Sequence, residues 1–232
     1  MPNGYTRSPK LLKGAFVKLS EEFLGPVPDI IVFQYNPETI KRDLTPSSAE
    51  SEFGGRWGEE TTAEPFDPGE KFDLTLEIDA TDALEEPDKH PVAVVSGIAD
   101  RISALEMLLY PVGDSLLGDL MPALFGSGDA VPRGSVPIVL FIWGPGRILP
   151  VRLTSFSVKE QAFSPSLYPI RASVTVGLQV LPDQVFKKLG RKLSASEEMA
   201  VAAYKFTRGQ REVLARTNLA NSAESILSML PF

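Results

Sequence analysis

The sequence predicts a mainly β, α+β fold: an antiparallel β-domain with one embedded helix, followed by a helical C-terminal extension. Residues 70–79 and 168–181 alternate between apolar and polar side chains, which is typical of antiparallel strands with one face in a core and one in solvent. Residues 91–111 carry apolar side chains at helical spacing. Strong helix formers follow Pro182, so we expect two units, residues 1–186 and 187–232.

The N-terminal third predicts one or two strands and a long loop. Segments 11–19 and 30–35 are rich in β-branched and aromatic residues, and prolines separate them. Residues 43–69 are rich in Ser, Gly, Pro and Glu and show no period. Loops of that length are usually functional or mobile.

The strand predicted at 70–79 directs four side chains to one face: Phe72, Leu74, Leu76 and Ile78. The embedded helix is predicted between Pro91 and Pro111, and residues 112–135 are Gly-rich and loop-like.

Residues 136–144, VPIVLFIWG, are apolar on both faces. They predict a central strand that is buried on both sides, or one whose outer face meets a partner. Residues 147–163 predict one or two further strands, and residues 168–181 predict the last strand.

The C-terminal extension begins with a helix signal. Ser194 precedes Glu197 by three residues, which is a capping-box pattern, and helix formers follow. Residues 218–230 predict a separate, short last helix. Short isolated helices are marginal in water, so we expect these helices to dock on their own domain or on a partner.

Composition excludes several classes of protein. The chain has 232 residues and a formal net charge of −7, with no basic run that could grip nucleic acid or an anionic membrane. It has no cysteine, which excludes disulfides and thiolate zinc sites. The first residues lack the apolar region of a signal peptide, and the longest apolar run is far shorter than the ~20 residues of a membrane span. We expect a soluble, cytosolic protein with no direct membrane contact.

Catalysis finds no positive support in the sequence. His90 is the only histidine and stands beside a proline, without an evident partner. The acidic segment 79–88 does not have the spacing of a calcium loop, and the glycine-rich segments 125–135 and 143–147 lack the Lys-Ser/Thr of a phosphate loop. We therefore predict no catalytic, metal-binding or cofactor-binding residues, and no enzyme.

Three separated motifs stand in a specific order. The first is FQYNPETI at 33–40, the second VPIVLFIWG at 136–144, and the third lies in 156–181. Over about residues 10–182 this order resembles the N-terminal domain of the contractile injection system tube-type family, found in extracellular injection particles and phage-tail-like machines. The matching positions are Phe33, Tyr35, Asn36, Pro37, Glu38, Pro137, Phe141, Trp143, Gly144, Phe163, Pro169, Arg171 and Ala172.

Two features depart from the family pattern. Tyr35 stands where Phe is more usual, and SPSLYP at 164–169 replaces the usual Asp-Gly-Thr-Pro turn. Many members also carry a LysM domain, but no LysM-like pattern follows Pro182 here.

The resemblance implies an antiparallel, tube-like β-barrel for residues 1–186. It also implies a hexameric ring between the trimeric spike or hub protein and the inner tube protein, with baseplate wedge proteins as neighbours. The chain is then a structural component of an injection particle that assembles in the cytoplasm, either as the spike-to-tube adaptor or as a neighbouring ring component.

The motifs suggest specific interface residues. We interpret Asn36-Pro37 as a turn, in which Asn36 bonds its own following backbone, that launches the long loop toward the next subunit. Trp57 and Phe66 in that loop are candidate anchors on a neighbour, or else they pack on their own domain. Arg171, on the wet face of its strand, either pairs with a neighbour's carboxylate from segment 77–88, which includes Glu77, or faces solvent without a partner.

Two other functions remain open. One is a stand-alone all-β module that binds a small ligand or a peptide, and the other is an enzyme with a scattered carboxylate site. Among the three, the sequence favours the structural ring component.

Overall fold

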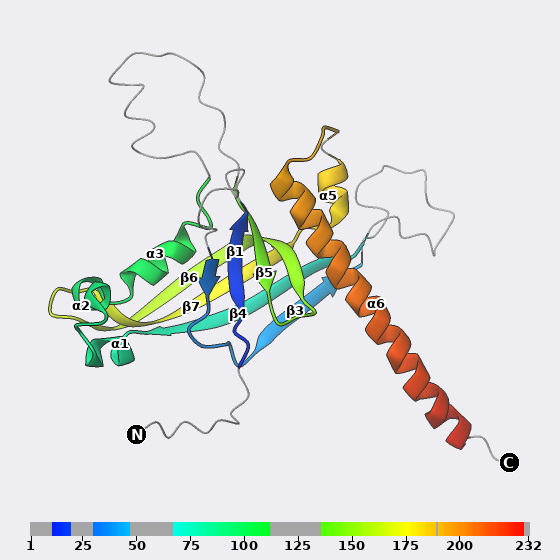
Figure 1. The fold of residues 1–232 in the computed structure, drawn as a ribbon, viewed down its shortest axis with the longest axis horizontal. Helices are drawn as coiled ribbons and strands as arrows, with labels where there is room; N and C mark the ends of the chain where they lie inside the picture. Colours follow the sequence, from blue (N-terminus) through cyan, green and yellow to red (C-terminus); the bar gives the residue numbers. More distant parts are fainter. Residues whose placement is uncertain (1–10, 20–29, 47–66, 112–135, 189, 230–232) are drawn as a thin grey trace.

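The computed structural model describes residues 11–19, 30–46, 67–111, 136–188 and 190–229, and its centre is one antiparallel sheet (Figure 1). The seven strands in the described residues follow the order β2-β1-β5-β6-β7-β4-β3. Their bounds are β1 Ala15–Leu19, β2 Ile30–Val32, β3 Ile40–Thr45, β4 Gly69–Asp79, β5 Ile138–Ile142, β6 Ile148–Phe163 and β7 Pro169–Val180. The helices are α1 Thr81–Glu85, α2 Pro91–Ser96, α3 Ala99–Glu106, α5 Asp183–Lys187 and α6 Ala195–Met229.

The sheet is curled but open, so the predicted closed barrel is wrong in its closure. Within the described residues, β2 pairs only with β1, and β3 pairs only with β4. Curling still brings the two ends of the sheet close together. Gln34, just after β2, forms hydrogen bonds with the backbone of Asp79 at the end of β4. Since β2 has three residues and β3 covers only positions 69–74 of β4, the two edges are too short to pair and seal the sheet.

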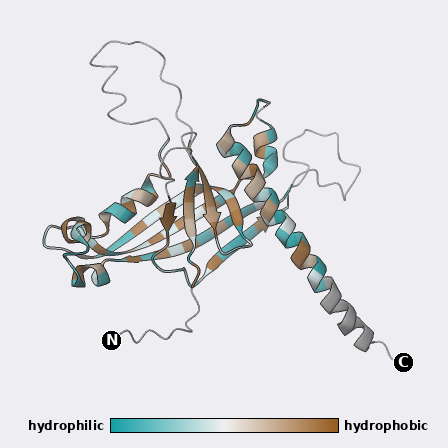
Figure 2. Ribbon diagram, in the orientation of Figure 1, coloured by the Kyte–Doolittle hydropathy of each residue, from teal (hydrophilic) through white to brown (hydrophobic). Residues whose placement is uncertain are grey.

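The alternating segments form the predicted strands. In β4 the side chains of Phe72, Leu74, Leu76 and Ile78 are buried, while the residues between them are exposed or half-buried. β7 pairs with β4 from Lys71↔Gln179 to Asp79↔Arg171. The alternation is visible as bands of opposite hydropathy along the strands in Figure 2.

The doubly apolar segment forms β5, and both its faces are buried as predicted. Val139 and Phe141 belong to the main core inside the curled sheet. Leu140 faces the other way and packs in a second cluster that includes Phe186 of α5 and Ala200 of α6. The chain's own C-terminal helices therefore cover the outer face of β5.

Residues 148–163 form one long strand, β6, whereas the sequence predicted either one or two strands here. The pairing of β6 with β7 is irregular between Leu153 and Ser155. Gly177 lies opposite this irregularity, and a Cβ there would come within 2.3 Å of the Ser155 hydroxyl.

The embedded helix is interrupted, which corrects the single helix predicted between Pro91 and Pro111. α2 ends at Gly97, whose φ of 60° is a left-handed conformation, and α3 follows. The Ile98 N–H donates to the carbonyl of Pro169, and a Cβ on Gly97 would lie 2.1 Å from that carbonyl oxygen. A further short helix, α1, occupies part of the acidic segment 79–88.

The long loop is shorter than the predicted range of residues 43–69. Residues 43–45 belong to β3 and residue 69 begins β4, so edge-strand pairing extends into both ends of the polar segment. Residues 47–66 of that loop and the predicted loop 112–135 lie outside the described residues.

The C-terminal extension contains one 35-residue helix, α6, in place of the two predicted helices. The predicted capping box forms: the Ser194 N–H donates to Glu197 Oε2 at 2.8 Å, and the Glu197 N–H donates to Ser194 Oγ at 3.4 Å. The first turns pack on the chain's own sheet, and the helix then passes the end of β3 and projects beyond the sheet (Figure 1). Of the helices in the described part of the chain, none combines the length and apolar composition needed to cross a membrane.

Candidate assembly surface

The first two family-like motifs meet in one aromatic cluster. Phe33 follows β2, and Phe141 and Trp143 end β5. The ring centroids of Phe33 and Phe141 are 6.5 Å apart, and those of Phe141 and Trp143 are 6.3 Å apart. Gly14 permits this packing, because a Cβ there would lie 2.7 Å from both the Phe33 and the Trp143 rings.

Asn36 joins two parts of the chain instead of bonding its own following backbone as predicted. Its Oδ1 accepts from the Gly14 N–H at 2.9 Å, and its Nδ2 donates to the Leu12 carbonyl at 2.8 Å. After Pro37 the chain enters the edge strand β3 before it reaches the polar loop. The side chain of Tyr35 beside it is exposed.

Gln34 acts at the end of β4 as a neighbouring strand would. Its amide donates to the Asp79 carbonyl at 2.7 Å and accepts from the Asp79 N–H at 3.0 Å, which is the bond pair that an antiparallel partner makes. Arg101 of α3 donates to the same amide oxygen at 2.7 Å. One side chain from the first motif therefore joins both ends of the sheet and α3.

Asp79 links this junction to the third motif. Arg171 Nε donates to Asp79 Oδ2 at 2.7 Å, so Arg171 pairs within its own chain, whereas we expected either a neighbour's carboxylate or solvent. The Thr81 hydroxyl and N–H also donate to the Asp79 carboxylate. Burial raises the pKa of Asp79, but the bonds from Thr81 and Arg171 outweigh burial and hold the pKa below its ordinary value. We call Gln34, Asp79, Arg101 and Arg171 the junction.

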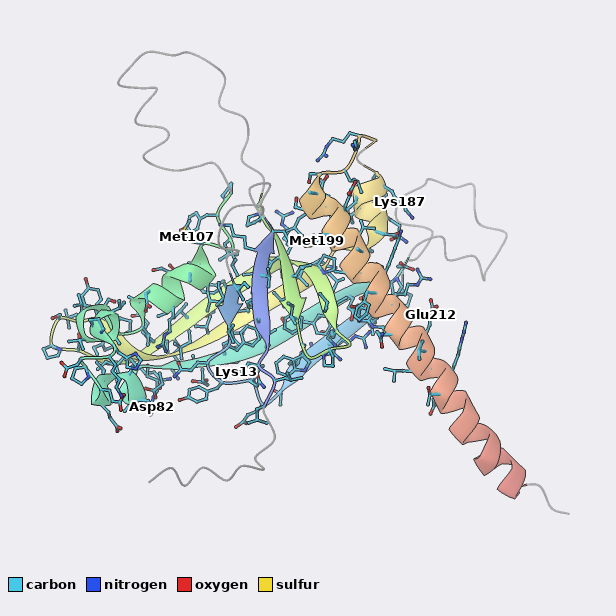
Figure 3. All side chains as sticks on the ribbon, viewed as in Figure 1. Lys13, Asp82, Met107, Lys187, Met199 and Glu212 are labelled. Carbon is cyan, nitrogen blue, oxygen red and sulfur yellow. The ribbon has the colours of Figure 1, made fainter. Side chains whose placement is uncertain are left out.

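A groove opens beside the junction, between the two ends of the sheet. Its volume is about 470 Å³, and its walls come from β2, from residues 76–78 of β4 and from α3. Most wall residues are apolar, whereas Lys13, Glu77, Asp100 and Arg101 supply the charges. Glu77, predicted as an interface residue, thus lies on an accessible surface. Lys13, labelled in Figure 3, comes from the segment just before β1.

The remaining predicted positions are spread over the sheet. Gly144 ends the β5 region with a φ of 72°, where the Trp143 N–H donates to the Arg147 carbonyl. Phe163 and Pro169 face each other at the closed end of the β6–β7 hairpin, and Ala172 is fully buried. Trp57 and Phe66 lie outside the described residues.

A second polar cluster, which sequence reasoning missed, fastens α6 to the edge of the sheet. Glu70 of β4 is buried and accepts from Arg42 of β3 and, through both carboxylate oxygens, from Arg211 of α6. One and two turns earlier in α6, Arg208 and Tyr204 donate to Asp67. The signal in the sequence was weak. Glu70 lies two residues before Phe72, so its side chain points to the same, core-facing side of the strand.

The residues considered for chemistry include His90 and the acidic segment 79–88. His90 is exposed at the start of α2, and its side chain makes no capping bond there. The parts of the chain that the structure describes contain no group of three or more His, Cys, Asp or Glu residues placed to hold a metal ion.

No protein-family model matches this chain, and no curated protein matches its sequence.

Proposed function

We propose that this chain is a structural, non-enzymatic ring subunit in the baseplate of a contractile injection system, where it adapts the central spike or hub to the inner tube. Its partners are other copies of itself in a hexameric ring, the inner tube protein, the trimeric spike protein and the baseplate wedge proteins.

The open sheet is the observation that carries the proposal. Exposed strand edges invite pairing with other chains, and a protein that stays monomeric usually blunts them with charges or covers. On β2, however, Ile30 is 52% exposed and Val32 is 55% exposed. A closed ring of subunits would bury such edges.

The contacts among the motif segments add support. Segments separated by more than 100 residues meet in the aromatic cluster, and the junction joins the first motif to the third. The three motifs therefore contact one another in the folded chain, and these contacts support treating them as one set, as the family resemblance behind the proposal does.

The test is the mass of the purified protein, alone and mixed with candidate spike and tube proteins, measured by light scattering and native mass spectrometry. A ring of 25.3 kDa subunits, or a complex of six subunits with a trimeric spike, is the expected result. A monomer that binds neither partner at high micromolar concentration would refute the proposal.

The groove favours a second candidate, a stand-alone binding module. A largely apolar groove of about 470 Å³ with a few charged groups is within the size range of small-molecule sites. A ligand that binds only the folded protein would raise its melting temperature. Ligand-dependent stabilisation of a persistent monomer would favour this function over the ring.

A further inference from the structure

The closed end of the β6–β7 hairpin carries apolar side chains that are exposed among the described residues. Phe163, Leu167 and Tyr168 are all exposed, and the Leu167 side chain is 80% exposed. α2 lies beside this turn, since Ile98 at its end bonds the Pro169 carbonyl, and it adds the exposed Val92 and Val95. Figure 2 shows the hydrophobic colour of α2 at this end of the molecule. We call Phe163, Leu167 and Tyr168 the hairpin tip.

Leu167 holds a backbone conformation that a leucine rarely adopts. Its φ is 64°, in the left-handed region that glycine occupies freely. A strained residue persists when something else favours it. Hydrogen bonds within the turn hold this backbone, since the Leu167 N–H donates to the Ser164 carbonyl and the Tyr168 N–H donates to Ser164 Oγ, and the turn presents the Leu167 side chain to solvent.

The same chain offers a concave apolar surface of its own. The groove beside the junction has walls of Ile30, Val32, Leu76 and Ala104, among others, and no residue of the hairpin tip lines it. The tip is held as a closed turn, because Phe163 pairs with Pro169 and the Ser164 N–H donates to the Tyr168 carbonyl.

We propose that the hairpin tip of one copy inserts into the groove of the next copy. An apolar projection and an apolar groove on separate surfaces of one chain form a heterologous, head-to-tail contact, which repeats around an axis and closes as a ring. Leu167 is then the anchor side chain, and the charged groups around the groove form the polar rim. This inference rests on the proposed ring and names the surfaces that build it.

Cross-linking tests the contact directly, because the chain has no cysteine of its own. Single-cysteine variants Leu167→Cys and Ala104→Cys are purified separately, mixed and oxidised. We expect a cross-linked dimer in the mixture and none in either variant alone. Ser157→Cys, an exposed position on β6 that does not line the groove, replaces Ala104→Cys as the control and should give no dimer.

A second variant separates folding from assembly. Leu167→Asn replaces the strained leucine with a residue that tolerates the left-handed region and removes the apolar anchor. At a dilution where both proteins are monomeric, we expect its melting temperature to rise by about 2–4 °C. The concentration at which the ring dissociates should rise by about tenfold or more. Leu11→Asn, another highly exposed leucine, should change neither quantity.

The outcomes separate this inference from the proposed function. A ring that forms without the 167–104 cross-link, or that survives Leu167→Asn unchanged, would overturn the tip-in-groove contact and leave the ring proposal standing. Cross-linking of Leu167→Cys to itself would indicate a symmetric tip-to-tip contact and would also overturn it. A protein that stays monomeric at all concentrations would overturn both.

Discussion

Asn36 holds together parts of the chain that are more than twenty residues apart, and it does so with two hydrogen bonds to backbone groups. These bonds fix the segment before β1 against the end of β2. The sequence motif around Asn36-Pro37 therefore serves the domain itself, and the long loop is reached only after β3.

We expect Asn36→Ala to lower the free energy of unfolding by about 1–2 kcal/mol, because two backbone groups lose their partner. Urea denaturation followed by tryptophan fluorescence measures the change. Glu38→Ala, at an exposed position in the same turn, is the matched control. Unchanged stability with a smaller assembly would instead support our initial interpretation of the turn as an assembly element.

Glu197 shows how a single carboxylate can start a long helix. It accepts from the Ser194 N–H and from both terminal nitrogens of the Arg191 guanidinium. Burial raises the pKa of Glu197, but the bonds from Arg191 and Ser194 outweigh burial and lower the pKa below its ordinary value of 4.5.

A lowered pKa in the folded state means that the ionised form stabilises the fold above about pH 4.5. This contribution disappears as the pH falls through the lower, folded-state pKa. We expect Glu197→Gln to destabilise the protein by about 1–2 kcal/mol at pH 7. The difference from wild type should narrow below pH 4.5, whereas Glu198→Gln, at an exposed site, should have little effect at any pH. A difference that persists at pH 3 would contradict the charge-based explanation.

At the scale of elements, α2 and α3 are set against the sheet by a close backbone approach. The carbonyl of Pro169 at the start of β7 accepts from Ile98, and Gly97 supplies the left-handed turn that makes room for it. The periodic apolar pattern of residues 91–111 did not reveal this break, because Ile98, Ile102 and Leu105 beyond it continue the helical spacing and belong to the main core.

We expect Gly97→Ala to destabilise the protein by about 2 kcal/mol or more, since the added Cβ meets the Pro169 carbonyl and the left-handed backbone becomes strained. Thermal and urea unfolding measure this loss. Gly146→Ala is the control, because nothing lies within 4 Å of a Cβ built there. Equal effects of the two changes would show that Gly97 is not held by this contact.

α6 is the element whose position depends most on tertiary contacts. Apolar packing holds its first turns, Thr207 bonds the backbone of Ile148, and the arginines at 208 and 211 reach carboxylates at the edge of the sheet. Beyond these contacts Val213 and Leu214 are exposed. The docked part therefore sets the direction in which the remainder of the helix leaves the sheet.

At the scale of the whole molecule, the curled sheet presents two short open edges and a groove between them. We expect Val32→Lys, which places a charge on the exposed edge strand β2, to reduce the assembled mass and leave the unfolding free energy within about 0.5 kcal/mol of wild type. Ser157→Lys, in the middle of the sheet, adds the same charge away from both edges. Native mass spectrometry of the pair tests the prediction, and equal masses for the two variants would count against assembly through this edge.

The sequence by itself determined that residues 70–79, 136–144 and 168–181 contain strands, and which faces of these strands are buried. Alternation with a period of two predicted β4 and β7, and a doubly apolar run predicted that β5 is covered on both sides. These features follow from local geometry, since neighbouring side chains of a strand point to opposite faces wherever the strand lies. The capping box of α6 is local for the same reason.

Only the tertiary structure decided how the strands curl and what meets at their ends. Gln34 and Asp79 are 45 residues apart, and Asp79 and Arg171 are 92 residues apart, so no local pattern pairs them. Asp79 and Arg171 meet because they are partners across the β4–β7 ladder, whereas Gln34 reaches Asp79 because the twisted sheet curls. Whether the sheet closes depends on the lengths of its two end strands, and because β2 and β3 are short, it leaves a groove where a closed barrel was expected.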